Sequence, residues 1–238
     1  MSGGAASRGR DEELLLARIS AAAGRARLGR RRATYRALPA EPGTRWAATA
    51  GAGLRRLLRT GGGPAARAGA RLDLYEQGMT AAVGKQIHAV RFDTTVVRRR
   101  RVLSSRGVTR ALVLVDVDGE RIVLRCGDFG RPEEWWAEIR RAVVDAQVPR
   151  ALAALRRGAR LAFGPVWITG DEVGSGGTVL RWAQVQRIEV RNGFVAVRAT
   201  GRWQVWAAAA SGVPNLCVFH ALAERLAGAG AGAGRDGD

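Results

Sequence analysis

The sequence predicts a mainly β protein of the α+β class, in which two sets of antiparallel strands are each closed by a C-terminal amphipathic helix. Strand-like runs joined by tight-turn dipeptides fill most of residues 71–227. An amphipathic pattern opened by proline follows each set, at Pro132 and at Pro214. These signals occur twice in the same order, which is typical of a duplicated unit.

Residues 1–70 predict a basic N-terminal region that precedes both sets of strands. This region holds fourteen arginines and four acidic residues, a net charge of +10. Acidic residues open and arginines close a segment with apolar residues at helical spacing, so we expect a helix over 11–28. A short basic helix is predicted over 46–59, and the Gly-Gly-Gly-Pro segment at 61–64 predicts a linker. The glycine- and alanine-rich residues 1–10 are expected to be disordered.

The first set of strands, within residues 71–158, contains a clear hairpin signal. Two apolar runs flank Asp118-Gly119, where glycine tolerates the positive φ that a tight turn needs. The helix opened by Pro132 is expected to end near Val148, and a second helical stretch is expected from Pro149 to Arg157.

The helix opened by Pro132 carries two adjacent tryptophans, Trp135 and Trp136. Neighbouring residues on a helix point in different directions, so both cannot face inward. We expect one of them to stay partly exposed, against the other repeat or against a partner.

The second set, residues 159–227, repeats this arrangement. Asn192-Gly193 lies between two alternating runs and predicts a hairpin. The helix after Pro214 presents Phe219 and Leu222 on its apolar face. The Gly/Ala-rich segment 228–238 predicts a disordered tail.

The two halves match position by position at the level of elements. The matched pairs are Tyr75 with Trp167, Gly78 with Gly170, Arg91 with Arg181, Phe92 with Trp182, Gly119 with Gly201, and Pro132 with Pro214. The sequence therefore predicts an internal repeat.

Three motifs in the second half carry a resemblance to a known family. They are Leu161-x-Phe-Gly, Leu180-Arg-Trp-x-x-Val-x-x-Ile188 and Val213-Pro-Asn-Leu-x-Val-Phe219. They resemble an uncharacterised bacterial family of unknown function with tandem pleckstrin-homology-like domains, over residues 72–227. The resemblance implies two small bent antiparallel barrels, each closed by a helix, and a binding role without catalytic residues. The expected structural core consists of Phe92, Trp182, Trp203, Trp206, Phe219 and Leu222.

The charge of the chain favours anionic partners. The net charge is +18, and all basic residues except Lys85 are arginine. The base composition of a GC-rich genome explains arginine in place of lysine, but it does not explain the net charge. Candidate contacts to an anionic surface are Arg98, Arg99, Arg100 and Arg101, expected in a loop, together with Arg30, Arg31 and Arg32. The alternative for Arg98–Arg101 is a solvated loop, and the alternative for the N-terminal region is a helix docked on the barrel followed by a disordered linker.

The remaining chemistry-bearing residues are few. Cys126 and Cys217 are expected as buried free thiols in a reduced, cytoplasmic protein, because no further ligands accompany them. His88 has no acidic partner nearby in the sequence, and His220 with Glu224 is too small a set for a metal site. We therefore expect no catalytic residues, no metal and no cofactor.

Three functional hypotheses follow from these features. The first is a non-enzymatic binding or scaffold protein that acts on a protein partner near the inner membrane face. The second is a peripheral binder of anionic lipid. The third, nucleic-acid binding, is less favoured, because charge alone supports it and no recognition motif accompanies the charge.

Overall fold

The computed structural model describes residues 3–37, 70–83, 86–104 and 107–233. The helix predicted over 46–59 and the linker at 61–64 lie outside these residues. The chain divides into two compact units, Met1–Thr95 with Arg101–Ala142, and Val96–Arg100 with Val143–Asp238. Over the described ranges the fold is mainly β with three α-helices and four antiparallel sheets, which confirms the α+β class. None of these four sheets closes into a barrel.

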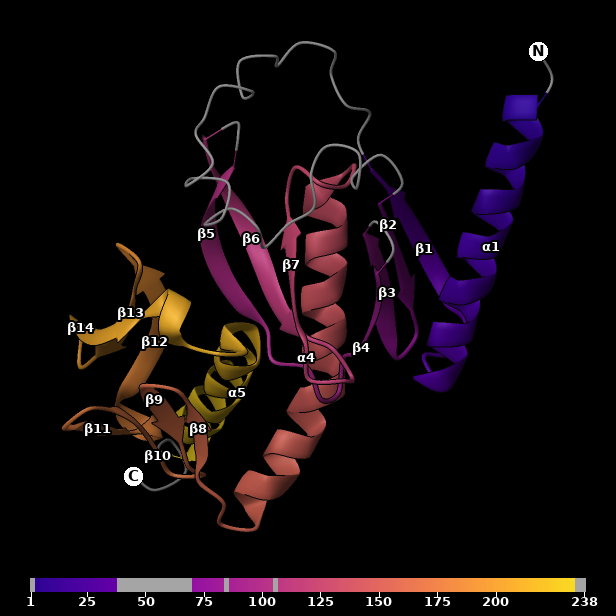
Figure 1. Cartoon of the computed structure of the whole chain (residues 1–238). Coiled ribbons are helices and arrows are strands. Elements are labelled where there is room, and N and C mark those ends of the chain that lie inside the picture. Colours follow the sequence, from indigo (N-terminus) through magenta and orange to yellow (C-terminus); the bar gives the residue numbers. More distant parts are fainter. Residues whose placement is uncertain (1–2, 38–69, 84–85, 105–106, 234–238) are drawn as a thin grey trace. The chain divides into compact units, whose positions relative to one another are not determined.

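The first unit begins with a helix and a four-stranded sheet (Figure 1). Their bounds are α1 (Gly3–Arg25), β1 (Arg31–Arg36), β2 (Arg71–Tyr75), β3 (Gly78–Val83) and β4 (Gln86–Arg91). The strand order is β1-β2-β3-β4. Strand β1 was missed by the sequence analysis, which assigned no strand before residue 71.

Helix α1 differs from its prediction at both ends. It begins at Gly3 instead of Asp11 and ends at Arg25 instead of Leu28. The early start has a local cause, since alanine is the strongest helix former and Ala5-Ala6 fall in the first turns. The helix contacts β3 and β4 through its small apolar face, where Ile19 is 1% exposed.

A three-stranded sheet and a helix follow in order. Their bounds are β5 (Arg98–Ser104), β6 (Gly107–Val115), β7 (Arg121–Arg125) and α4 (Pro132–Arg156). The predicted hairpin is confirmed, since β6 pairs with β7 across a turn where Gly119 has a φ of 84°. The four consecutive arginines lie in strand β5, so their prediction as a loop is wrong. Strand formation satisfies the backbone of this segment by pairing it in the sheet, whatever the charge of the side chains.

Helix α4 also corrects a predicted boundary. It runs without interruption through Pro149, where two helices were expected. A proline inside a helix removes one backbone hydrogen bond, which packing on either side of it can offset. Val148 and Leu155, on either side of Pro149, are at most 4% exposed. As predicted, one tryptophan of the adjacent pair is buried, Trp135 at 0%, while Trp136 is half-buried.

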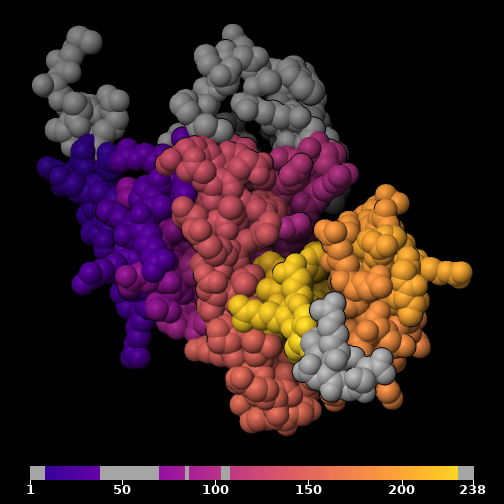
Figure 2. Space-filling model, turned by 180° about the vertical axis from the view of Figure 1, so that it is seen from behind, coloured from indigo at the N-terminus to yellow at the C-terminus, as the bar shows by residue number. Residues whose placement is uncertain are grey.

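The second unit contains the other two sheets and a helix, which are coloured orange to yellow in Figure 2. The bounds are β8 (Leu161–Phe163), β9 (Val166–Ile168), β10 (Glu172–Ser175), β11 (Thr178–Arg181), β12 (Val185–Arg191), β13 (Phe194–Ala199), β14 (Arg202–Ala209) and α5 (Leu216–Ala233). Short 3-10 helices occupy Trp182–Gln184 and Ala210–Gly212. The Asn192-Gly193 hairpin is confirmed, with φ values of 51° and 83°. Helix α5 continues to Ala233, beyond residue 227, because alanine at every second position supports a helix despite the glycines.

The order of elements recurs along the described chain. A four-stranded sheet, a three-stranded sheet and a helix occur in that order, and then occur again. Of the expected core residues, all except Trp203 are at most 5% exposed. Trp203 is half-buried. No helix in the described residues combines the length and apolarity needed to cross a membrane.

Candidate functional site

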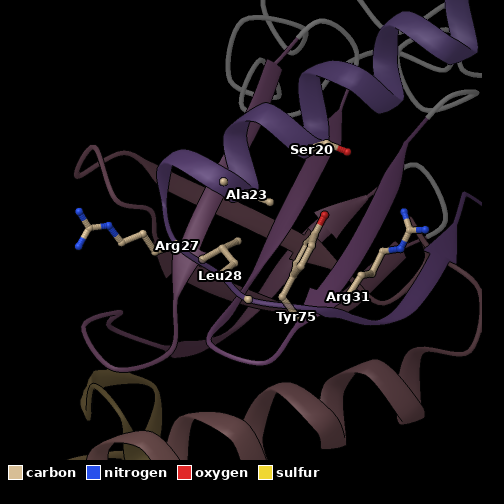
Figure 3. A pocket seen from close by; sticks show the side chains of 8 residues that line it. Ser20, Ala23, Arg27, Leu28, Arg31 and Tyr75 are labelled. Atoms are coloured by element: carbon tan, nitrogen blue, oxygen red, sulfur yellow. The ribbon is translucent and has the colours of Figure 1, made fainter.

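A cavity of about 380 Å³ lies in the first unit, where α1 ends and β2 approaches it (Figure 3). Figure 3 shows the Tyr75 ring rising toward Ser20, with Arg27 and Arg31 on opposite sides and pointing away from each other. The other lining residues are Ala23, Gly24, Leu28 and Gly29. The residues around the cavity therefore include two arginines, two hydroxyl-bearing residues and small apolar residues.

A compact chain reversal after α1 forms one wall of this cavity. The Leu28 amide donates to the Ala23 carbonyl over 3.0 Å, and the Gln77 amide donates to the Leu28 carbonyl over 2.9 Å. Gly29 has a φ of 81°, and a Cβ added there would lie 2.7 Å from Glu76 Oε2. Glycine at this position thus serves both the left-handed backbone and the close approach of Glu76.

The lining of the cavity is polar and positively charged on part of its surface. Burial raises the pKa of Tyr75, so its phenol stays protonated and can donate a hydrogen bond. Arg27 and Arg31 are exposed and positively charged. None of the lining residues is a histidine, cysteine or carboxylate, so this lining supplies no pair of nucleophile and base.

A buried polar cluster lies between β1 and β2. Arg71 donates from Nε to Asp73 Oδ2 over 2.7 Å and from Nη2 to Asp73 Oδ1 over 3.0 Å. The Thr34 hydroxyl donates to the same carboxylate from the facing position on β1. Asp73 is 0% exposed and Arg71 is 9% exposed. The side-chain hydrogen bond to Asp73 raises the pKa of Arg71, and the cluster holds the two strands together.

A second polar pair joins β4 to the β6–β7 turn. His88 Nδ1 lies 2.7 Å from Asp116 Oδ2. Asp116 Oδ1 also accepts the backbone amides of Asp118 at 3.0 Å and Glu120 at 2.8 Å. No acid lies near His88 in the sequence, and strand packing supplies one from a residue 28 positions away. This carboxylate closes the turn and orients His88.

The arginines singled out in the sequence fall in two places. Arg30, Arg31 and Arg32 are all exposed, just before and at the start of β1. Arg99, Arg100 and Arg101 are exposed on β5, an edge strand of its sheet. Arg98 is only partly exposed, and its Nη1 donates to the Gly212 carbonyl over 3.1 Å. The four arginines of β5 are thus not equivalent, since one of them has a structural role.

In the second unit, the sequence analysis missed an arginine contact on the β12–β14 sheet. The guanidinium carbon of Arg191 lies 4.6 Å from the Trp203 ring centroid. Trp203 was expected in the core. Its place on the side of the sheet away from the core depends on strand register, which no local signal specifies.

The described residues also lack the usual signs of a metal centre. Within residues 3–37, 70–83, 86–104 and 107–233, no group of three or more histidine, cysteine or acidic side chains could hold a metal ion. Cys126 and Cys217 form no disulfide, and both are of intermediate exposure, so the prediction that they are buried is wrong.

The fold and these sites define a β-rich class of protein, built from two sets of sheets with a helix each and carrying basic and aromatic surface positions. Within that class, the chain belongs to the family described as "Family of unknown function (DUF6585)", which matches residues 65–229. No curated protein and no solved structure matches the chain. The family match includes Tyr75 and the whole β12–β14 sheet, whereas the other residues that line the cavity precede it.

Proposed function

We propose that this chain is a non-enzymatic binding protein, in which two pleckstrin-homology-like units in tandem hold a protein partner near the cytoplasmic face of the membrane. The observation that carries the proposal is the repeated order of a four-stranded sheet, a three-stranded sheet and a helix. This order fits two sheets that bend over one core with a helix at the open end, an architecture that offers its loops and sheet faces to ligands.

The chemistry of the polar residues supports binding over catalysis. Arg71 is hydrogen-bonded to Asp73 and His88 to Asp116, and Asp116 also accepts backbone amides of its turn. In this proposal both pairs stabilise the fold and take no part in a reaction. The proposed protein accordingly uses no cofactor.

In-cell crosslinking of the full chain, followed by mass spectrometry, tests the binding role. We expect crosslinks from the described units to a defined partner protein, which then binds the full chain when both are purified. A chain that crosslinks only to itself, or whose crosslinked neighbours fail to bind it when purified, would contradict the proposal.

A second candidate function, binding to an anionic membrane surface, is favoured by the exposure of Arg30–Arg32 and Arg99–Arg101. Each basic residue near an anionic leaflet contributes about 1 kcal/mol. Its test is co-sedimentation of the full chain with phosphatidylserine vesicles and with neutral vesicles. Removal of residues 1–69 is not a suitable control, because it would delete β1 and leave β2 unpaired on that side. The replacement of Arg30, Arg31 and Arg32 by glutamine keeps the strand.

Binding that depends on acidic lipid and is lost in the triple glutamine variant would support the membrane role. Binding that is equal on neutral vesicles would contradict it. Nucleic acid is the least favoured partner, and steep salt dependence without lipid dependence would reverse that order.

A further inference from the structure

The three-stranded sheet β12–β14 buries only one of its two faces. On the inner face, Val195, Val197 and Trp206 are at most 5% exposed, and α5 contacts β12. Successive residues of a strand point to opposite faces, so the residues between these form a second set. We term this second set the outer face. Besides Glu189 and the buried Ala196, its members are Arg187 and Arg191 from β12, Phe194 and Arg198 from β13, and Trp203 and Val205 from β14.

The register of the strands brings these six residues together. Arg191 lies opposite Phe194 on the neighbouring strand. Arg198 lies between Arg187 on one side and Trp203 on the other. Directly opposite residues on one face have Cβ atoms about 5 Å apart, so these side chains share one surface. The outer face is therefore a single patch and not a set of scattered exposed residues.

The patch is more apolar than a solvated sheet face. Val205 is 59% exposed and Phe194 is 43% exposed. An antiparallel sheet with one solvated face carries polar residues on that face as a rule. Exposed large apolar side chains that cluster next to an aromatic ring are instead typical of an interaction site.

Two side chains of the patch are held in place before any partner binds. The Arg191 guanidinium lies over the Trp203 ring at 4.6 Å. The two residues come from strands on opposite sides of β13, and Ala196 of β13 lies between them on the same face with 0% of its surface exposed. The stacking therefore restricts both side chains in the free protein. Such preorganisation lowers the entropic cost of binding.

The charge of the patch is positive. Arg187 pairs with Glu189 over 3.1 Å. Neither Arg191 nor Arg198 forms an ion pair with a carboxylate in the part of the chain that the structure describes. Arginine binds carboxylates with two parallel hydrogen bonds, so this surface is complementary to acidic side chains.

We propose that the outer face of β12–β14 docks a protein partner that presents an apolar side chain next to aspartate or glutamate. This rests on the proposed binding function and assigns it a surface. Tryptophan, phenylalanine and arginine are the residues enriched in protein interfaces and their hot spots. Single-stranded nucleic acid fits less well, because base stacking needs open ring faces and Arg191 covers a face of Trp203.

A displayed library of random peptides, selected on the full chain, tests this proposal. We expect the recovered peptides to combine acidic with large apolar residues. Their affinity is then measured by fluorescence anisotropy against variants of the full chain. Combined Phe194→Ser and Val205→Ser should weaken binding about tenfold or more. Arg198→Gln should weaken it about fivefold at low salt and less at high salt.

Matched controls lie elsewhere in the same unit. Val179 on β11 is 48% exposed, so Val179→Ser removes a comparable apolar side chain outside the patch. Arg225→Gln removes an exposed arginine from α5. Both control variants should bind the peptides as the unchanged chain does, and all variants should keep its melting temperature.

Several results would overturn the proposal. These are a library that yields no binder, peptides that bind the outer-face variants as well as the unchanged chain, and peptides without acidic residues. The proposal also fails if the outer-face variants lose binding to oligo(dT) or to phosphatidylserine vesicles and keep binding to peptides. The outer face would then bind nucleic acid or a membrane.

The proposed function can be judged separately by the crosslinking yield. A crosslinked partner that the Phe194→Ser and Val205→Ser variant captures unchanged would refute the outer face and leave the binding function standing. Conversely, peptide binding at the outer face with no crosslinked partner would count against the cellular function and not against the site.

Discussion

The two three-stranded sheets of the molecule occupy the same place in the order of elements, yet their surfaces differ. In β6, successive residues from Ala111 to Leu114 are all at most 5% exposed, so both faces of this strand are covered. In β13, Phe194 and Arg198 are exposed on the outer face, although Ala196 between them is 0% exposed. A continuous Leu-Val-Leu run suits a strand buried on both faces, whereas Phe-Val-Ala-Val-Arg does not.

The two sheets therefore differ in which side chains they bury, although they hold the same position in the repeated order of elements. The first sheet buries its apolar residues in the core. The second leaves an aromatic, an aliphatic and several basic side chains on a surface. Substitutions at buried and exposed positions, and at equivalent positions of the two units, test this difference.

The largest effect is expected at the helix that follows the second sheet. Phe219 is 0% exposed, and its ring centroid lies 5.6 Å from that of Phe163. Phe219→Ala should lower the free energy of unfolding by about 3–5 kcal/mol, because it removes buried aromatic area and leaves a cavity. Denaturant unfolding measures this change.

Phe194→Ala is the matched control for Phe219→Ala, since it makes the same truncation at a position that is 43% exposed. Its effect should stay within about 0.5 kcal/mol, as for most surface substitutions. Equal losses at the two positions would show that the outer face belongs to the core, and the contrast between the two sheets would then fail.

The next effect concerns a buried ion pair on β2, at a place where the corresponding strand β9 buries apolar Val166 and Ile168. Asp73→Ala should destabilise the chain by about 3–5 kcal/mol, because it leaves the Arg71 guanidinium buried without its carboxylate. Thermal and denaturant unfolding provide the measurement.

Replacing both partners tests the cause of that loss. Combined Arg71→Leu and Asp73→Leu removes both charges, as in β9, and should recover most of the stability lost in Asp73→Ala. A double variant as unstable as Asp73→Ala alone would mean that the lost hydrogen bond to Thr34 matters more than the uncompensated charge.

A smaller effect separates two glycines that the sequence places at equivalent positions of the repeat. A Cβ at Gly78 would lie 2.0 Å from the Val90 carbonyl oxygen and 2.7 Å from Leu28 Cδ2. A Cβ at Gly170 would meet only the Leu155 carbonyl oxygen, at 3.7 Å. Gly78→Ala should therefore cost about 1–3 kcal/mol through overpacking.

Gly170→Ala should change the free energy of unfolding by less than about 0.5 kcal/mol, because the added methyl group has space. Equal losses in the two variants would show that the surroundings of the two glycines are packed equally tightly. The difference in packing between the units would then be absent at this position.

Some features of the fold could be predicted because their signals are local. Gly119 and the Asn192-Gly193 pair mark their hairpins through the backbone conformations that tight turns require. Trp135 is buried and Trp136 only half-buried, as two neighbours on one helix must differ. These predictions depend only on residues that are close together in the sequence.

The features that sequence reasoning missed depend on distant partners. Strand β1 buries only Tyr35 fully and is rich in arginine, so it shows no alternation. It exists because β2, which begins at residue 71, pairs with it. The contact of His88 with Asp116 depends on packing between elements in the same way.

The position of Trp203 on the outer face could not be predicted from the sequence either. A shift of one residue in register moves an aromatic residue from the core to the surface, and composition cannot distinguish the two outcomes. The outer face therefore became visible only when the pairing of β12, β13 and β14 was known.

The smallest predicted effect concerns the cysteine that follows β7. Burial, reinforced by the charge of Glu133, raises the pKa of the Cys126 thiol, so less thiolate is present at any given pH than in an ordinary cysteine. Cys126 should therefore react slowly with iodoacetamide at neutral pH, and faster as the pH rises beyond the usual thiol range. Glu133→Gln should speed the reaction modestly, because it removes one of the charges that oppose the thiolate.

Peptide mapping by mass spectrometry separates Cys126 from Cys217 in this experiment, and Glu134→Gln, one residue further along α4, is the matched control. Rapid labelling of Cys126 at neutral pH would show that the end of β7 opens to solvent. The first sheet would then be less closed than its buried strand β6 indicates, and the contrast with β12–β14 would weaken.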